Sequence, residues 1–207
     1  AGTFSVAAGF SMNPMKILHA YGEAGVVVTN RKSIFQKVKE LRHAGIQPDP
    51  KGIDINRCME VSLNHKIDTI QAAMLMVNLN RISKIRKYRG QIADLYDSEL
   101  EGYGLLQPVA DGETHGRYIY LMACSKRNRL RKFLFDHGIE TKVFYSPLVC
   151  DSQVYREEER LEVPMARKLL RKAISIPFHE NMTMKQAQYV ASRVKEFFNA
   201  SKSKRNV

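Results

Sequence analysis

The sequence contains no tryptophan and only three cysteines among its 207 residues. The cysteines, Cys58, Cys124 and Cys150, are far apart, odd in number and without Cys-x-x-Cys spacing, which argues against a disulfide framework and against a zinc site. None of the six histidines is paired at i, i+4 spacing, so we expect no metal. These absences fit a protein of the reducing cytoplasm.

Long apolar runs and targeting signals are also absent. The longest clear apolar run, Ala24 to Val28, has the size of a strand and falls far short of the roughly 18 residues that a membrane-spanning helix needs. The sequence starts at Ala1, and its opening residues lack the basic start and cleavage site of a secretory signal. We therefore expect no membrane partner, and we expect the sequence to be cut from a longer chain.

Acidic residues are few relative to basic ones: 21 Asp and Glu stand against 33 Lys and Arg, for a net charge of +12. Such an excess by itself favours a polyanionic partner such as nucleic acid. The basic residues, however, form separate clusters rather than one stripe with interleaved aromatics, as is typical of solvated helix faces. We expect no nucleic-acid partner and keep a basic nucleic-acid-binding module as an alternative. Neither a Gly-x-x-x-x-Gly-Lys-Ser/Thr loop nor a Gly-x-Gly-x-x-Gly fingerprint is present.

The first part of the chain has the pattern of an α/β domain. Residues 4–11 and 26–29 are predicted strands of a parallel or mixed sheet, and the β-branched run of the second has the size of a buried strand. Ser33-x-x-Gln36 has the form of a capping box and predicts the start of a helix that ends before Gly45.

Two further helices are predicted before residue 101. Asp68-x-x-Gln71 predicts the start of the first, which ends near Leu79 and carries apolar residues at helical spacing on one face, namely Ile70, Ala73, Met74 and Val77. A separate, highly charged helix follows over residues 82–100 and is stopped by Gly102 and Gly104.

The second part alternates strands with helices, which predicts a small α/β sandwich. The predicted strands are 118–122, 139–144 and 174–176, and the predicted helices are 128–135 and 165–172. A final helix starts at the capping box Thr183-x-x-Gln186, and a short basic tail follows Ala200.

One lysine, Lys16, stands between apolar neighbours in a proline-containing turn that follows the strand end at Ser11. Apolar surroundings disfavour the charged form of an amine, which is how a lysine becomes nucleophilic near neutral pH. The residues alone therefore indicate a candidate catalytic lysine. A solvated lysine at a strand exit is the plainer alternative.

Here the sequence resembles a known family, the DegT/DnrJ/EryC1/StrS sugar aminotransferases. Phe10 to Thr29 is similar to the family signature Phe-Ser-Phe-x-x-x-Lys-x-x-x-x-Gly-Glu-Gly-Gly-x-Val-x-Thr, and Val61 to Ala73 is similar to Gly-Tyr-Asn-x-Arg-x-x-x-x-x-Gln-Ala-Ala. Further matches follow in family order at His115-x-x-Tyr118, Gly138-Ile139-Glu140-Thr141, Tyr145-x-Pro147-Leu148 and Ser175-Ile176-Pro177. The resemblance covers essentially the whole chain.

The resemblance implies the C-terminal part of an aspartate-aminotransferase-like, fold type I α/β enzyme. The implied organisation is a remnant of the large cofactor-binding domain over residues 1–82, a connecting helix over 83–102, a small α/β domain over 103–200 and a basic tail over 201–207. It also implies pyridoxal 5'-phosphate as cofactor, a keto-sugar substrate that is usually nucleotide-linked, glutamate as amino donor, and a homodimer with shared active sites. The setting would be surface-polysaccharide or amino-sugar biosynthesis.

Three residues receive roles from the resemblance. Lys16 would form the Schiff base with the cofactor and transfer protons as acid and base, and Ser11 would donate a hydrogen bond to the cofactor phosphate. Asn64 would reach the phosphate of the neighbouring subunit's cofactor. For Ser11 and Asn64 the plainer alternatives are a turn hydroxyl and a loop amide.

Several features depart from the family pattern. Met12, Asn13 and Met15 replace the usual residues before the lysine, Lys66 stands where Arg is common, and Val149 stands where many members have His. The acidic partner of the ring nitrogen, the ring-stacking aromatic and a second phosphate site would belong to a preceding stretch, so we expect this fragment alone to be inactive and to hold the cofactor poorly. A sugar dehydratase of the same fold is an alternative, but such relatives carry histidine in place of the lysine.

Overall fold

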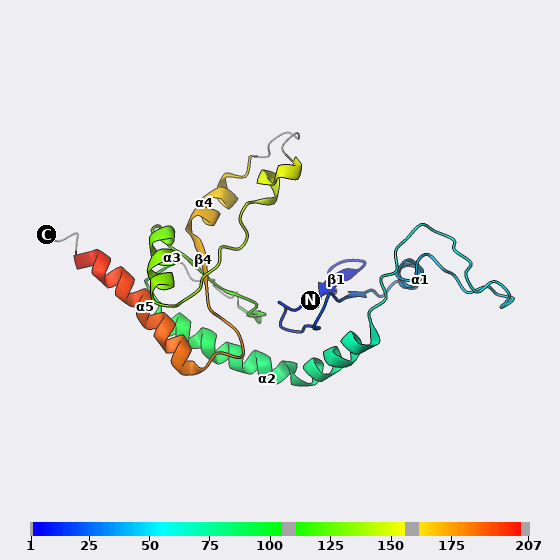
Figure 1. Cartoon of the computed structure of the whole chain (residues 1–207), viewed down its shortest axis with the longest axis horizontal. Coiled ribbons are helices and arrows are strands. Elements are labelled where there is room, and N and C mark those ends of the chain that lie inside the picture. The colour runs from blue at the N-terminus through cyan, green and yellow to red at the C-terminus, as the bar shows by residue number, and fades with distance from the viewer. Residues whose placement is uncertain (1, 105–110, 156–161, 204–207) are drawn as a thin grey trace. The chain divides into compact units, whose positions relative to one another are not determined.

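The computed structural model describes residues 2–104, 111–155 and 162–203, with side chains through Ala200, and shows a mixed α/β fold (Figure 1). It divides into two compact units, Ala1–Ser83 and Lys84–Val207, and helix α2 runs from the first into the second. The predicted assignment of residue ranges to a large domain, a connecting helix and a small domain stays a prediction. Within the described ranges, no helix is long and apolar enough to cross a membrane.

The first unit contains a two-stranded sheet. Strands β1 (Ala8–Ser11) and β2 (Gly25–Val28) pair antiparallel, with Phe10 opposite Val26 and Ala8 opposite Val28. The prediction of a parallel or mixed sheet with a buried second strand is wrong for these residues, because the valines of β2 are 39–50% exposed. An apolar strand is buried only where another layer packs on it, and the described residues supply no such layer here.

Helix α1 (Lys32–Leu41) begins one residue before the predicted Ser33 capping box, and that prediction is wrong. Its N-cap is Arg31, in extended conformation and without a side-chain cap. The Arg31 amide instead donates to Thr29 Oγ1 at 3.0 Å, which turns the chain out of β2 into the helix. The helix ends at Leu41, before the Gly45 at which the sequence predicted its stop. Gly45 itself has φ +72°, and a Cβ there would lie 1.9 Å from the Glu60 carbonyl oxygen.

Helix α2 (Thr69–Glu99) is one continuous element, so the two helices predicted on either side of Leu79 are wrong. No glycine or proline stands between Leu79 and Ile82 to stop the first helix, and the change from apolar to charged composition is no break in the backbone.

The second unit contains the remaining elements: β3 (Tyr120–Ala123), α3 (Arg127–Asp136), the 3-10 turns η1 (Val149–Asp151) and η2 (Gln153–Tyr155), α4 (Pro164–Lys172), β4 (Ala173–Ile176) and α5 (Met184–Ser203). β3 and β4 pair antiparallel, with Met122 opposite Ile174. The predicted helices over 128–135 and 165–172 and the predicted strand over 174–176 are confirmed. The predicted strand over 139–144 is wrong, since only Lys142 pairs, in an isolated bridge with Ser175.

This second unit has a closed apolar core between the sheet, α3, α5 and the second half of α2. Tyr96, Leu100, Met122, Leu134 and Val194 are completely buried in it. α5 begins with the predicted capping box: the Thr183 amide donates to Gln186 Oε1 at 2.8 Å, and the Gln186 amide donates to Thr183 Oγ1 at 3.2 Å. α5 continues through Ser203, past the predicted start of the basic tail, and residues 204–207 of that tail lie outside the described residues.

A buried guanidinium ties α2 to two loops of the second unit. Arg89 is 5% exposed; its Nε donates to the Arg117 carbonyl at 2.9 Å and its Nη2 to the Tyr118 carbonyl at 2.7 Å. Its Nη1 pairs with Glu180 Oε2 at 2.6 Å, and the group lies 4.7 Å from the centre of the Phe178 ring. One side chain thereby holds the chain before β3 and the chain after β4 against the same helix.

Candidate functional site

Ser11 and Lys16 lie on one tight turn at the end of β1. The Asn13 amide lies 3.5 Å from Ser11 Oγ, at the outer limit of a hydrogen bond, and the Lys16 amide donates to the Asn13 carbonyl at 3.0 Å. Asn13 Oδ1 also accepts from the Met15 amide at 3.2 Å. The structure therefore brings two of the three predicted site residues together, with Asn13 as the residue that shapes the turn between them.

The turn is anchored to the neighbouring strand and to its own exit. The Met12 amide donates to the Ala24 carbonyl, and the Ala20 amide donates to the Met12 carbonyl, both at 2.8 Å. Ala20, whose amide forms the second of these bonds, is completely buried. The loop is thus closed by main-chain bonds, as a rigid platform for side chains requires.

Lys16 is half-buried as a residue, and of its neighbours in the chain Met15 is exposed whereas Ile17 and Leu18 are half-buried. Its carbonyl oxygen lies 3.0 Å from His19 Nδ1, so the imidazole donates there when Nδ1 carries the proton. Lys16 as a residue is thus partly exposed, and the apolar surroundings predicted for its amine stay a prediction.

Two polar side chains of α2 hold the far end of this loop, and sequence reasoning missed both roles. Asn78, only 4% exposed, donates from Nδ2 to the His19 carbonyl at 2.8 Å. Gln71 Oε1 accepts from the Tyr21 amide at 2.8 Å, across 50 residues of chain. A Cβ on Gly22 would lie 3.2 Å from the Gln71 amide nitrogen, so glycine lets the helix approach the loop closely. The spacing Asp68-x-x-Gln71 suggested that Gln71 caps the start of the helix, but its side chain binds the Tyr21 amide of the loop.

Asn64 is not brought to this turn. It lies exposed in the segment between α1 and α2, where it forms an isolated antiparallel bridge with His43. The adjacent Ser62 hydroxyl donates to the Leu41 carbonyl at 2.7 Å, and the His65 amide donates to the Arg42 carbonyl at 2.9 Å. Asn64 is therefore held on its own loop, and its role toward a neighbouring subunit stays a prediction.

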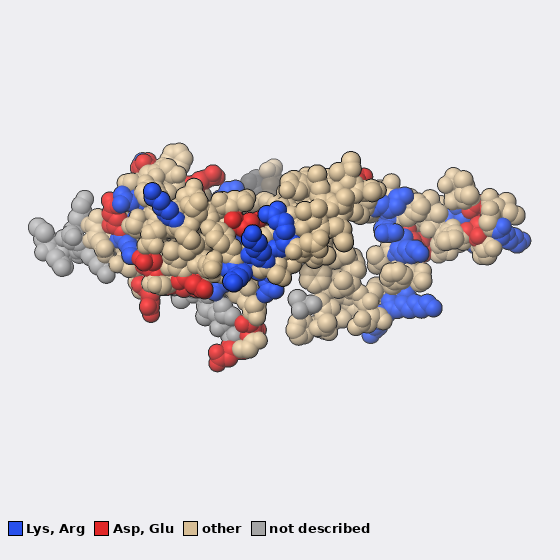
Figure 2. Space-filling model, turned by 90° about the horizontal axis from the view of Figure 1, so that it is seen from below, with Lys and Arg blue, Asp and Glu red and all other residues tan. Residues whose placement is uncertain are grey.

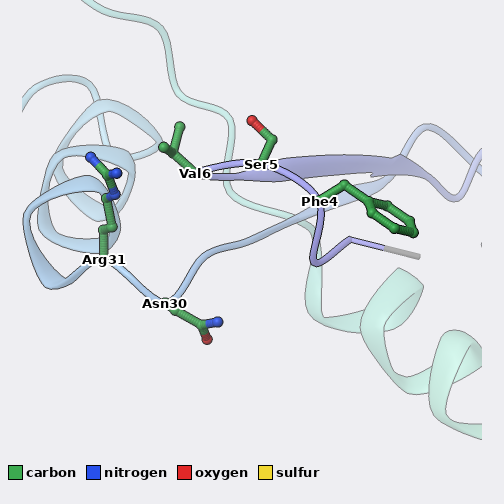
Figure 3. Close-up of a pocket in the computed structure, with 5 residues that line it drawn as sticks. All are labelled: Phe4, Ser5, Val6, Asn30 and Arg31. Carbon is green, nitrogen blue, oxygen red and sulfur yellow. The ribbon is translucent and has the colours of Figure 1, made fainter.

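Two hollows of the surface are lined by other residues. One, of about 450 Å³, is lined by Phe4, Ser5, Val6, Asn30 and Arg31, and Figure 3 shows these side chains around the chain before β1 and the chain that enters α1. Another, of about 510 Å³, lies along α3 and residues 140–141. Neither includes Ser11, Lys16 or Asn64. No group of three or more potential metal ligands occurs among the residues that the structure describes.

The family-like segments of the second unit have structural partners. His115 Nδ1 accepts from the Arg117 amide at 2.8 Å, and Arg117 has a positive φ of 53° just before β3. The Tyr118 carbonyl is one of the acceptors of Arg89, and the Pro177 carbonyl accepts from the Tyr96 hydroxyl at 2.8 Å. The chain at Tyr118 and at Pro177 is thus held by side chains of α2.

Comparison with known proteins gives one family. Residues 1–195 match the model of the DegT/DnrJ/EryC1/StrS aminotransferase family. A pleiotropic regulatory protein of Geobacillus stearothermophilus is 31% identical over 206 residues, which make up 95% of this chain and 53% of that protein. The dTDP-3-amino-3,4,6-trideoxy-alpha-D-glucose transaminase of Streptomyces venezuelae is 28% identical over 204 residues, 95% of this chain and 51% of that enzyme.

A solved structure agrees with these relatives. S. venezuelae DesV, in complex with a ketimine intermediate, matches with a TM-score of 0.85 and 26% identity over 95% of this chain and 53% of the DesV chain. The predicted family resemblance and the predicted fold type I architecture are confirmed. The chain spans about half the length of the relatives that it matches.

Proposed function

Since this chain belongs to the DegT/DnrJ/EryC1/StrS aminotransferase family, we propose that it is the C-terminal part of an enzyme that transfers an amino group to a keto-sugar with the help of pyridoxal 5'-phosphate. The proposed substrate is nucleotide-linked, with glutamate as donor, in amino-sugar or surface-polysaccharide biosynthesis. Named relatives support this class, among them the S. venezuelae transaminase and a GDP-perosamine synthase of Vibrio cholerae. A cytoplasmic location and a homodimer with shared active sites are part of the proposal.

The observation that carries the proposal is the turn that joins Ser11 to Lys16. A pyridoxal phosphate site needs an amine for the aldehyde and donors without negative charge for the phosphate. The Ser11–Lys16 turn supplies one hydroxyl and the amine of a half-buried lysine five residues apart, on a loop closed by main-chain hydrogen bonds. The Ser11 hydroxyl and the Lys16 amine therefore fit part of the cofactor, and the cofactor's remaining contacts would come from protein outside this chain.

The chemistry that the cofactor supplies when bound is an electron sink for charge that develops on the substrate carbon. Lys16 Nζ would hold the aldehyde until the amine of the substrate takes its place, and the freed Lys16 amine would then move a proton between the substrate carbon and the C4′ carbon of the cofactor. Ser11 Oγ would donate a hydrogen bond to the phosphate. Asn64 would do the same for the neighbouring subunit's cofactor, which accounts for its place on a separate loop.

The charge distribution offers weaker support to the nucleic-acid alternative. On the face shown in Figure 2, Lys and Arg occur in several groups with Asp and Glu among them. Electrostatic binding to phosphates weakens steeply with salt, by orders of magnitude when several contacts form. A salt titration of binding to duplex DNA would distinguish the two alternatives. A polyanion-binding module should bind DNA with an affinity that falls steeply with salt, whereas the proposed enzyme should show no such affinity.

The direct test is chemical labelling in the intact parent protein. Incubation with pyridoxal phosphate, reduction with borohydride and peptide mapping should place the label on Lys16, and Lys16→Ala should abolish both the label and the visible absorption of the bound cofactor. Lys51→Ala, which removes an exposed lysine outside the family-like segments, is the matched control and should leave the label unchanged. The isolated 207-residue chain should show little of either signal. A label that persists in Lys16→Ala refutes the assignment.

A further inference from the structure

The second unit has a hollow in its surface along α3. Its volume is about 510 Å³, within the range of about 300–1,000 Å³ that is typical of small-molecule sites. Four residues of α3 and two of the segment after it line this hollow: Asn128, Arg131, Lys132, Phe135, Glu140 and Thr141. The four helix residues follow the i, i+3, i+4, i+7 spacing of one helix face. All six belong to the unit that has the closed apolar core, so the exposed surfaces of the first unit play no part in the hollow.

One residue of this hollow, Thr141, has a buried hydroxyl without a hydrogen-bond partner. Thr141 is 8% exposed, and its Oγ1 has no partner among the described residues. Buried side-chain hydroxyls nearly always have a partner, because an unpaired one has lost its water without compensation. Of the four described residues with such an atom, Thr141 is the one that lines either of the two hollows. A ligand that accepts a hydrogen bond there would complete this hydroxyl.

Phe135 contributes an aromatic ring to the same hollow. It is 71% exposed, whereas the adjacent Leu134 is completely buried in the core. A single exposed apolar side chain is ordinary on a protein surface, and by itself it indicates nothing. Beside a hollow, however, an exposed aromatic ring offers a surface on which the flat ring of a ligand can stack.

The charged residues of the hollow have both signs. Arg131 supplies a guanidinium, whose planar set of donors suits a phosphate at two points. Lys132 already pairs with Asp136 at 2.8 Å, so Arg131 is the stronger partner for an anion. Glu140 is exposed and supplies a carboxylate, which accepts hydrogen bonds from hydroxyl groups such as those of a ribose. The hollow therefore suits a ligand that carries both an anionic group and hydroxyl donors.

We propose that the α3 hollow binds a nucleotide, with its base against Phe135, its ribose hydroxyls at Glu140, its phosphate at Arg131 and the Thr141 hydroxyl as a further donor to it. A free phosphate would leave Phe135 uncovered, and an apolar ring alone would leave Arg131 and Thr141 without an acceptor. A nucleotide carries a flat ring, hydroxyl groups and an anion in one molecule. The inference is independent of the proposed transamination, because Lys16 does not line this hollow.

The experiment is isothermal titration calorimetry of the 207-residue chain with three probes: adenosine 5′-monophosphate, adenosine and inorganic phosphate. The monophosphate should bind about tenfold or more tightly than either other probe, because each of those lacks the ring or the anion. Phe135→Ala removes the stacking surface and should weaken the monophosphate about tenfold. Arg131→Ala removes the donors to the phosphate and should weaken it about tenfold or more. Arg129→Ala is the matched control: it removes the same charge from an exposed position of the same helix that does not line the hollow, and should have little effect.

Thr141→Val tests the hydroxyl in two ways. Valine has nearly the same shape, so the variant should weaken the monophosphate about threefold to tenfold through the loss of one hydrogen bond. Without ligand, the same variant should resist urea at least as well as the wild type, because an apolar group replaces an unpaired buried hydroxyl. A loss of stability would show that the hydroxyl has a partner inside the protein, and would overturn the inference.

Three results of the titrations also overturn the inference. The first is no binding of the monophosphate to the wild-type chain. The second is equal weakening by Arg129→Ala and Arg131→Ala, which would show a general attraction to a basic helix. The third is adenosine or inorganic phosphate binding as tightly as the monophosphate. Lys16→Ala should bind the monophosphate like the wild type, so the nucleotide site and the proposed chemistry stand or fail separately.

Discussion

Replacing Arg89 should destabilise the second unit far more than replacing any exposed basic residue. The guanidinium is almost completely buried and serves two carbonyl oxygens and the Glu180 carboxylate at 2.6–2.9 Å. Arg89→Met keeps most of the apolar stem and removes every donor. The three acceptors then lose their partner in a site that admits little water.

The magnitude follows from what is left behind. Removing one partner of a buried ion pair costs about 3–5 kcal/mol, because the other charge stays buried without compensation. The Glu180 side chain keeps 20% exposure and recovers some hydration, which favours the lower end, about 3 kcal/mol. Arg89→Lys retains a charge for Glu180 but lacks the planar fork that reaches both carbonyls, and should cost about 1–3 kcal/mol.

The assay is urea unfolding of the full chain, followed by far-ultraviolet circular dichroism, because there is no tryptophan to serve as a fluorescence probe. Lys132→Ala is the control: its pair with Asp136 is 77% and 49% exposed, and such surface pairs contribute about 0–1 kcal/mol. A loss below 1 kcal/mol in Arg89→Met, or equal losses in Arg89→Met and Lys132→Ala, would refute the reasoning that this guanidinium holds the loops to α2.

Three further results are expected. Gly45→Ala should unfold the segment between α1 and α2, because the new Cβ meets the Glu60 carbonyl oxygen at 1.9 Å and φ is +72°; faster hydrogen exchange there would show it, and unchanged exchange would contradict it. Thr183→Ala removes the N-terminal cap of α5 and should cost about 1 kcal/mol in the same urea assay, with Thr183→Ser close to wild type. Burial raises the pKa of the Cys124 thiol, so maleimide should modify the exposed Cys58 first and Cys124 only when the second unit opens; equal rates in the folded chain would exclude this core.

Features that depend on neighbours in the chain were predicted best. The Thr183 capping box was correct because both of its hydrogen bonds close within three residues. The end of α1 was predicted less closely, since the helix stops at Leu41 and not at Gly45. The carbonyl that forbids a side chain at Gly45 belongs to Glu60, which sequence reasoning had not connected to it. Ser33 has the same local pattern but does not cap a helix. The Thr29 hydroxyl accepts from the Arg31 amide, and the helix starts at Lys32 with Arg31 as its N-cap.

Features that depend on composition were predicted less well. The change from apolar to charged residues near Leu79 suggested two helices, but a helix ends where its backbone is broken, and α2 continues. The burial of α2 changes along its length: Met74 in the first unit is exposed, whereas Tyr96 is buried in the apolar core of the second unit.

The sequence by itself determined the family and the residues of the turn that carries Lys16. The hydrogen bonds that shape this turn join residues only two or three positions apart, from Ser11 to Asn13 and from Asn13 to Lys16. Only the tertiary structure decided which side chains hold that turn and the second unit in place. The Gln71 bond to Tyr21 crosses 50 residues and the Arg89 bond to Glu180 crosses 91, and no local pattern predicts a partner at such separations. Such bonds depend on how the folded chain brings distant segments together, which the local sequence around each residue does not contain.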